Sequence, residues 1–528
     1  MTVILYIAAG ISLFSMLLCL PRQIHMLQQA SYYNLRYMAW LRGNWSRGAT
    51  LAAMTALLQI LLCFLGPMSH IPLLCLCVIS GVIRAYLAFK RLNTAIKKLV
   101  YTARVKRMIV SAALIAAALE AVMIIFIKDD TSAALFTAGC VLLCVLVPAV
   151  LIFVNILNRP LELFIAYMYV LAAKKILKRH TGMKIIGITG SYGKTSTKFF
   201  LGRMLSEKYN TLVTPESYNT LMGVVRTVRE YLKSGTQVFV VEMGARKPRD
   251  IKRIARLTHP EMGIITSVGP QHLDTFHTVE RIIKTKFELS DEVMKNGGVM
   301  YLNGDNEYIR ENAPENNTVF FGTGGGCGCT AEDIRYSRDG SQFTIKSGDI
   351  EIPVSTRLLG THNVLNILAA ASVALDLGLS PDELKYAVLS LAPVSHRLEM
   401  KPFLNGSVLI DDAFNANPSG SLEAVRVLGS FEGMRKIIVT PGLVELADKE
   451  YEHNYNLGLA AGKTCDVVIL VGQQRAVPMT DAIKTLPFDT ENLHVVDSFK
   501  QAMEILEKIT DQNTAVLFEN DLPDNYLK

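Results

Sequence analysis

The segment Met183–Leu201, MKIIGITGSYGKTSTKFFL, has the pattern of a loop that binds nucleotide phosphates. A short apolar run with Ile185, Ile186 and Ile188 is followed by a glycine turn, a lysine, three hydroxyl residues and a helix-compatible segment. This order is typical of a buried parallel strand, a tight loop and a helix N-terminus. Glycine lets the backbone approach a polyphosphate, and the amide groups of the loop and helix point toward the anion.

Residues of this segment that would contact the nucleotide are Gly190, Ser191, Gly193, Lys194, Thr195 and Ser196. Lys194 would reach the terminal phosphates, and the hydroxyl of Thr195 would bind a magnesium ion. The strict Walker pattern has a glycine five residues before Gly193, where this chain has Ile188. An ordinary glycine turn before a helix is therefore the alternative, and the polar residues found downstream argue against it.

Three polar residues downstream have chemistry that suits a phosphate-transferring site. Glu242 lies at the end of the apolar run 238–244, where a carboxylate would bind magnesium as a hard oxygen ligand. His272 follows the run 262–269 and would offer an imidazole to a second metal ion. Lys286, in KTKFEL, follows on a predicted helix. Taken singly, these residues would be a solvated glutamate, a hydrogen-bonding histidine and a surface lysine.

Length and composition indicate about three or four domains, with the apolar excess concentrated before residue 156. The net charge of +7 is modest, so a nucleic-acid partner is not the first explanation. The nine cysteines show no spaced framework, which fits reduced cytosolic thiols. Cys327 and Cys329, in GTGGGCGC, would make half of a metal site, but no second pair matches them and a flexible surface loop is the preferred interpretation.

Five apolar segments in the first third of the chain approach the length of a membrane-spanning helix: about 2–20, 49–67, 70–89, 108–127 and 132–155. The connections 21–48 and 90–107 carry Arg and Lys and no acidic residue. By the positive-inside rule these loops are cytoplasmic, which places the N-terminus outside and residue 156 inside. Glu120, within the fourth segment, marks either a polar pathway or an acid that faces neighbouring helices.

Beyond the apolar segments the pattern changes twice. Residues 157–181 have helical periodicity with one apolar side and basic residues near the end, as expected for an interfacial or linker helix. From 183 onward, short β-rich runs alternate with helical stretches, which predicts α/β layers with parallel sheets. The zone 322–348 favours a β-hairpin, and a second α/β domain is expected to start near 395.

Nine segments carry a resemblance to a known family: ITGSYGKTSTK, SYNTLMGVVRT, VVEMGARKPRDI, ITSVGPQHLDTF, KTKFEL, LNGDN, LLGTHNVLNILAAASVA, HRLE and DDAFNANPSGS. In this order they resemble the Mur ligases, ATP-dependent amide ligases of peptidoglycan precursor assembly, over roughly residues 183–475. The implied fold class is multi-domain, with an α-helical transmembrane region, an α/β P-loop central domain and an α/β Rossmann-like C-terminal domain. The corresponding boundaries are 1–156, 157–181 for the amphipathic linker helix, 182–394 and 395–528.

The resemblance also implies roles for residues of this chain. Glu242 would bind one magnesium ion and His272 the second, and Lys286 matches a family lysine that is carbamylated. Arg397 and Asp412 match residues of the C-terminal domain that close over ATP. Catalytic roles are implied for Lys194, Lys286, His272, Arg397 and Asp412. Acceptor contacts are implied for Tyr218, Asn219 and Thr220, and nucleotide contacts for Asn303, Asn363 and Asn366.

The implied activity is amide-bond formation through an acyl phosphate on a cell-wall precursor, with D-alanyl-D-alanine as the added amine. Two features depart from the family. Membrane segments stand where members carry a UDP-binding domain, and LFENDLP (517–523) replaces a lysine-glycine-serine-arginine strand end. A related ligase for a lipid-linked or polymeric acceptor, as in polyglutamate synthesis, and a non-catalytic membrane scaffold are the alternatives. The expected location is the bacterial cytoplasmic membrane, with several spans and cytoplasmic ligase domains.

Overall fold

The computed structural model describes residues 2–43, 98–129, 146–270, 273–337, 340–392, 398–413, 418–444 and 446–520, with isolated residues between 86 and 143. The chain divides into two compact units, Met1–Met168 and Tyr169–Leu522. The first unit is helical, and the second contains two α/β domains.

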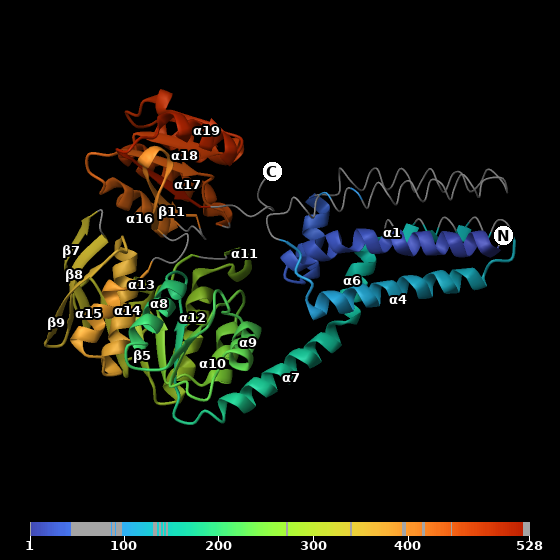
Figure 1. Ribbon diagram of the computed structural model, residues 1–528, viewed down its shortest axis with the longest axis horizontal. Helices are drawn as coiled ribbons and strands as arrows, with labels where there is room; N and C mark the ends of the chain where they lie inside the picture. Colours follow the sequence, from blue (N-terminus) through green and yellow to red (C-terminus); the bar gives the residue numbers. More distant parts are fainter. Residues whose placement is uncertain are drawn as a thin grey trace. The chain divides into compact units, whose positions relative to one another are not determined.

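The helical unit is built on α1 (Thr2–Gln29), α4 (Ala103–Ile125) and α6 (Val147–Leu157). The three helices are labelled in Figure 1, and their apolar side chains form one buried core that includes Leu20, Met108 and Leu151. Two described stretches, Ala9–Gln29 and Ala103–Ile125, are long and apolar enough to cross a membrane, and α6 with α7 (Arg159–Leu177) would make a third, bent by 45°.

Only some of the five predicted apolar segments can be compared with described helices. The segments at 2–20 and 108–127 coincide largely with α1 and α4, although α1 continues to Gln29. The segments at 49–67 and 70–89 lie outside the described residues except for Tyr86, and 132–155 is described only in part. The five-span arrangement therefore stays a prediction.

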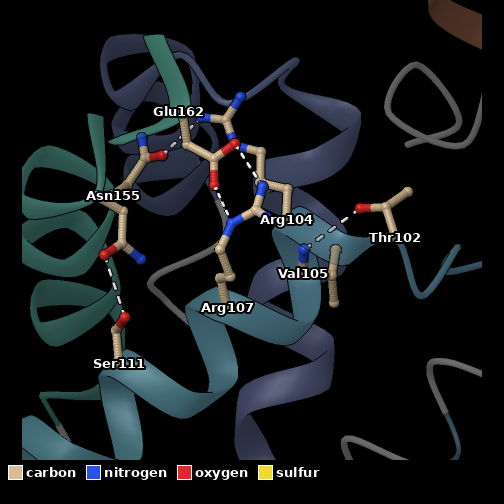
Figure 2. A network of polar contacts seen from close by, with 8 residues as sticks. Thr102, Arg104, Val105, Arg107, Ser111, Asn155 and Glu162 are labelled. Carbon is tan, nitrogen blue, oxygen red and sulfur yellow. Dashed lines mark hydrogen bonds and ion pairs between the residues drawn. The ribbon is translucent and has the colours of Figure 1, made fainter. Parts of the chain in front are cut away.

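A polar network joins the start of α4 to the turn between α6 and α7 (Figure 2). The Arg107 guanidinium donates to both Glu162 carboxylate oxygens, at 2.7 and 2.8 Å. Arg104 donates to Asn155 Oδ1 at 3.1 Å, and Ser111 donates to Asn158 at 3.1 Å. Because a two-pronged contact fixes direction as well as distance, the network holds the first turn of α7 against α4.

The central domain is built on nine described strands in the order β2-β3-β1-β4-β5-β6-β7-β8-β9. Neighbours from β2 to β7 are parallel, and β7, β8 and β9 form an antiparallel meander. The bounds are β1 Lys184–Thr189, β2 Thr211–Val213, β3 Val238–Glu242, β4 Met262–Ile265, β5 Val299–Asn303, β6 Thr318–Gly322, β7 Cys329–Ser337, β8 Gly340–Ser347 and β9 Ile350–Thr356. Parallel strands buried on both faces read as continuous apolar runs, as in KIIGIT of β1.

Helices cover both faces of this sheet (Figure 1). One face packs against α8 (Lys194–Leu205), α14 (Thr361–Asp376) and α15 (Pro381–Leu389). The other packs against α9 (Leu221–Glu230), α10 (Asp250–Thr258) and α12 (Val279–Lys295), and Ala173 near the end of α7 joins this core. The short helices α11 (Leu273–Phe276) and α13 (Glu307–Asn312) lie in connections. The strand β1 sits between β3 and β4, so the strand order changes direction there. In open α/β sheets ligands bind at such a point, in the crevice at the carboxyl ends of the strands.

The C-terminal domain has six described strands in the order β10-β11-β15-β12-β13-β14, and only the β10–β11 pair is antiparallel. The bounds are β10 Glu399–Pro402, β11 Val408–Asp412, β12 Arg435–Thr440, β13 Val467–Val471, β14 Leu493–Val496 and β15 Thr514–Glu519. One face packs against α16 (Pro418–Gly429), α17 (Glu450–Thr464) and α18 (Gln473–Ile483), and the other against α19 (Phe499–Ile509).

The predicted β-rich runs and the hairpin within 322–348 are confirmed. Residues 323–328 lie in no helix or strand, as the loop interpretation predicts, but that interpretation is wrong for Cys329. Cys329 begins strand β7 and its side chain is buried, because the strand pairs with β6 and β8. No group of three or more metal-ligating side chains occurs among the described residues.

Candidate active site

The loop between β1 and α8 forms a tight cradle at the centre of the sheet. Gly190 and Gly193 have φ values of +151° and +80°, which L side chains rarely adopt. A Cβ atom at Gly193 would lie 2.4 Å from Asn366 Oδ1, and one at Gly190 would lie 2.1 Å from Thr266 Oγ1. Glycine is therefore required at both positions for steric reasons as well.

Lys194 begins α8 and folds back over the loop. Its Nζ donates to the carbonyl oxygens of Gly190 and Ser191, at 2.7 and 2.8 Å. The Ser191 hydroxyl is held by the backbone of Gly269, with 3.1 Å contacts to both its carbonyl and its amide. These hydrogen bonds shape the loop and hold the Lys194 ammonium group at the N-terminus of α8, an arrangement that suits a polyphosphate.

Glu242 connects three segments at the crevice. The β1–β3 register pairs Ile188 with Glu242, so the carboxylate emerges next to the phosphate loop. Its Oε1 accepts hydrogen bonds from Thr195 Oγ1 at 3.1 Å and Asn219 Nδ2 at 3.0 Å. Its Oε2 lies 3.1 Å from the Nζ of Lys198 in an ion pair whose side chains are 1% and 0% exposed.

The electrostatics of the crevice favour an ionised Glu242. Burial raises the pKa of Glu242, but the charges of Lys198 and Lys194 and the hydrogen bond from Asn219 outweigh it and lower the pKa overall. The structure therefore presents the Glu242 carboxylate and the Thr195 hydroxyl 3.1 Å apart, and two such oxygens are suited to a hard divalent cation.

Lys286 lies on α12 and is only 3% exposed. Burial and the nearby charge of Lys194 push the pKa of Lys286 well below its usual value, against a smaller opposite effect of Glu288. The Glu288 carboxylate accepts from the backbone amides of Arg249 at 2.6 Å and Lys252 at 3.0 Å. This contact anchors α12, the helix that carries Lys286, to the start of α10.

The three predicted nucleotide-contacting asparagines are buried, and two of them bond residues next to the phosphate loop. Asn303 Nδ2 donates to the carbonyl of Thr266 at 2.8 Å, and Asn366 Oδ1 accepts from Thr197 at 3.1 Å. Asn363 instead donates to the carbonyl of Leu359 at the start of α14. These contacts position the loop and the helix, and whether the asparagines also touch a nucleotide stays a prediction.

The predicted acceptor-contacting residues lie in the connection from β2 to α9. Thr220 caps α9 by accepting from the amide of Gly223 at 3.2 Å. Tyr218 lies under the guanidinium of Arg226, with 5.2 Å between that group and the ring centre. Asn219 reaches Glu242, so this connection and the phosphate loop meet at one carboxylate.

The remaining predicted site residues are His272, Arg397 and Asp412. His272 and Arg397 fall outside the described residues. Asp412 ends β11, where its Oδ1 accepts from the amide of Leu398 at 3.1 Å. It pairs in register with Glu519 of β15, which is fully buried and bonded by the Ser421 hydroxyl.

Sequence reasoning missed three residues that shape these sites: Lys198, Glu288 and Glu519. Lys198 follows Thr195 by three residues and Lys194 by four, so helical periodicity alone places it on the same face of α8. Glu288 had no comparable signal, since its partners are backbone amides 36 and 39 residues away.

Two family descriptions match the chain. "Mur ligase middle domain" matches residues 188–374, and "Mur ligase, glutamate ligase domain" matches residues 396–519. The chain is 28% identical over 347 residues to the UDP-N-acetylmuramoyl-tripeptide–D-alanyl-D-alanine ligase of Bacillus subtilis, covering 65% of this chain and 74% of that protein. For the enzyme of the same name in Escherichia coli, the identity is 29%, covering 56% and 66%.

Solved structures give the same relationship. MurF from Acinetobacter baumannii superposes with a TM-score of 0.61 at 25% identity, covering 67% of this chain and 77% of that one. MurF ligase from Thermotoga maritima, solved in complex with ADP, gives 0.60 at 25%, covering 67% and 80%. The chain spans only 61% of a Buchnera aphidicola relative, and residues 1–187 lie outside both family matches. On these matches, residues 188–374 and 396–519 place the chain in the Mur ligase family of ATP-dependent amide ligases.

Proposed function

We propose that this chain adds D-alanyl-D-alanine to the tripeptide of a muramoyl cell-wall precursor, using ATP. The observation that carries the proposal is that Lys194 lies at the phosphate loop after β1 and Glu242 lies beside it at the end of β3, bonded by Thr195. The buried Lys286 lies close enough to Lys194 for the charge of Lys194 to lower its pKa. Relatives with the name UDP-N-acetylmuramoyl-tripeptide–D-alanyl-D-alanine ligase support the choice of acceptor and amine.

The reaction would proceed in two balanced steps. A carboxylate oxygen of the acceptor attacks the γ-phosphorus of ATP, the bond to the β-phosphate oxygen breaks, and an acyl phosphate and ADP form. The amine of the dipeptide then attacks the acyl carbon, phosphate leaves, and a proton is lost from nitrogen. Lys194 would offset charge on the transferring phosphoryl group, and Arg397 and Asp412 would complete the nucleotide site from the C-terminal domain.

Thr195 and Glu242 fit a magnesium site, because their oxygens converge at 3.1 Å and Glu242 is ionised. A magnesium ion there would neutralise phosphate charge and orient the nucleotide. The second expected magnesium site would use His272 and Lys286. The asparagines 303, 363 and 366 would contact the nucleotide, and Tyr218, Asn219 and Thr220 the acceptor.

Lys286 would carry a carbamate. Its buried amine has a lowered pKa, and only an unprotonated amine reacts with carbon dioxide. The Nζ lone pair forms a bond to the carbon of carbon dioxide, one C–O π bond becomes a lone pair on oxygen, and a proton leaves nitrogen. The product is an anion, which the positive charge of Lys194 would stabilise.

The N-terminal unit would anchor the enzyme in the cytoplasmic membrane. Residues 1–119 contain twelve Lys or Arg and no Asp or Glu, and the described outer face of α4 exposes Val110, Leu114 and Ile125 at 57–75%. An apolar outer surface with basic connections is typical of membrane helices whose loops are cytoplasmic. The linker α7 and domains at 182–394 and 395–528 would then be cytoplasmic, and the N-terminus would lie outside.

A second acceptor class is favoured by the same unit. Two described helices of this unit are long and apolar enough to cross a membrane, so a lipid-linked muropeptide at the bilayer surface is a candidate acceptor beside the soluble UDP-linked one.

The test is product formation by the purified full chain with ATP, magnesium and D-alanyl-D-alanine. One reaction receives UDP-N-acetylmuramoyl-tripeptide and the other a lipid-linked muropeptide, with product masses as the measurement. A pentapeptide product from the UDP-linked acceptor supports the proposal, and product from the lipid-linked acceptor alone supports the second class. Nucleotide binding with no product from either would support a scaffold. The control is Lys194→Ala with the same substrates.

A further inference from the structure

Lys198 is a second cation of α8, and it is completely buried behind the phosphate loop. Its side chain is 0% exposed, so its charge must be compensated by contacts within the protein. Two of those contacts are made with different segments of the chain, the end of β3 and the connection from β2 to α9. The Nζ lies 3.1 Å from Glu242 Oε2 and donates a 2.5 Å hydrogen bond to the carbonyl oxygen of Glu216.

The Glu216 carbonyl belongs to the connection that carries Tyr218, Asn219 and Thr220. Glu216 has a φ of +41°, a left-handed conformation that is costly for a residue with a side chain. The hydrogen bond from Lys198 orients the carbonyl of this strained residue. Asn219 ties the same connection to Glu242 from the other side, at 3.0 Å.

Glu242 is therefore shared between two groups of contacts. One oxygen faces Thr195 and Asn219, and the other faces Lys198. Because Lys198 binds Oε2, it leaves Oε1 directed at the hydroxyl of Thr195, and its charge contributes to the lowered pKa of the Glu242 carboxyl.

We infer that Lys198 is a positioning residue that aligns the Glu242 carboxylate and the 215–220 connection with each other. The ammonium group of Lys198 fixes both the carboxylate at which a divalent cation would bind and the segment that would hold the acceptor. The inference rests on the proposed function of this site. Lys198 itself would touch neither ATP nor the acceptor.

Two substitutions separate positioning from simple stabilisation. Lys198→Arg keeps the charge, but a planar guanidinium cannot reproduce the two directions of the ammonium contacts. Lys198→Met keeps a similar length without charge and leaves Glu242 buried without its partner. Lys233→Arg and Lys233→Met are the matched controls, since Lys233 is an exposed lysine of the same domain.

The first measurement is the magnesium concentration that gives half-maximal binding of a non-hydrolysable ATP analogue to the full chain. The second is the KM for UDP-N-acetylmuramoyl-tripeptide and for ATP. For Lys198→Arg we expect both the magnesium requirement and the acceptor KM to rise about tenfold, the size expected for one lost charge-assisted hydrogen bond, with a KM for ATP within about twofold of wild type. Circular dichroism and thermal melting establish that each variant is folded.

A folded Lys198→Arg whose magnesium requirement and acceptor KM both stay within about twofold of wild type would overturn the inference. If Lys198→Met does not fold, Lys198→Arg alone decides. If the wild-type chain makes no product, the proposed function fails, and the analogue-binding measurement still decides the role of Lys198 toward Glu242.

Discussion

The hydroxyl of Thr195 donates a 3.1 Å hydrogen bond to Glu242 Oε1, although the two residues are 47 positions apart. The contact joins the first turn of α8 to the end of β3 and defines a pair of oxygens beside the phosphate loop. A threonine hydroxyl and an ionised carboxylate are both magnesium ligands in phosphate-binding sites.

Thr195→Val should weaken magnesium-dependent nucleotide binding. Valine has the same shape without the oxygen, so the chain should stay folded while the magnesium concentration for half-maximal binding of an ATP analogue rises about tenfold or more. Calorimetric titration at several magnesium concentrations measures this. Thr195→Ser retains the hydroxyl and serves as the control. An unchanged magnesium requirement in the valine variant would exclude Thr195 as a ligand.

Lys194→Ala should remove the chemical step far more than it affects folding. The lysine donates to the Gly190 and Ser191 carbonyls, and the loop is also held by the hydrogen bonds between the Ser191 hydroxyl and the Gly269 backbone. We expect a loss of at least about a hundredfold in kcat, as for other groups that stabilise transition-state charge, with a nearly unchanged melting temperature. Phosphate release measures the rate, and Lys233→Ala is the control. Retained activity would refute the assignment.

Lys286→Ala should lose activity and regain part of it with short carboxylic acids. The alanine leaves a space in which acetate or formate would supply the anion of the proposed carbamate. Rescue should increase with acid concentration in Lys286→Ala and be absent in Lys194→Ala, measured by phosphate release. No rescue in a folded Lys286→Ala chain that still binds ATP would count against carbamylation.

Glu519→Gln should stabilise the chain increasingly as the pH rises. Burial and the neighbouring Asp412 raise the pKa of the Glu519 carboxyl well above its usual value, so the folded chain retains a proton that the unfolded chain releases. Below the usual glutamate pKa, Glu519 is protonated in both the folded and the unfolded chain. As the pH rises from that value toward the pKa of Glu519 in the folded chain, the free energy of unfolding decreases. Glutamine does not titrate, so the Glu519→Gln variant lacks this loss of stability.

The difference in apparent melting temperature between Glu519→Gln and wild type should therefore widen from pH 5 to pH 8. Differential scanning fluorimetry across this range measures it. Glu507→Gln, an exposed change on α19, should show no such trend. A constant difference at all pH values would mean that Glu519 is ionised in the folded chain.

The Arg107–Glu162 contact should contribute to the stability of the helical unit. The two-pronged geometry is favourable and the Glu162 side chain is 14% exposed, so a double-mutant cycle with Arg107→Gln and Glu162→Gln should give about 1–2 kcal/mol of coupling. Melting of the four proteins in detergent provides the values. A coupling near zero would show that the pair is too solvated to hold α7.

The sequence alone determined the phosphate loop, the α/β order of the strands and the family resemblance. These depend on local patterns: an apolar run read as β1, glycine at Gly190 and Gly193, and a lysine at the start of α8. Such signals are short-range, because strand burial, positive φ angles and helix starts are set by neighbouring residues.

Only the tertiary structure decided which polar groups meet. Lys198 reads as an ordinary helix lysine until β3 brings Glu242 within 3.1 Å of it. Glu519 reads as a strand-end acid until β15 pairs with β11 and places it beside Asp412. Contacts between residues tens of positions apart arise from strand order and register, and no local pattern encodes these, because parallel neighbours in a sheet are joined through crossovers.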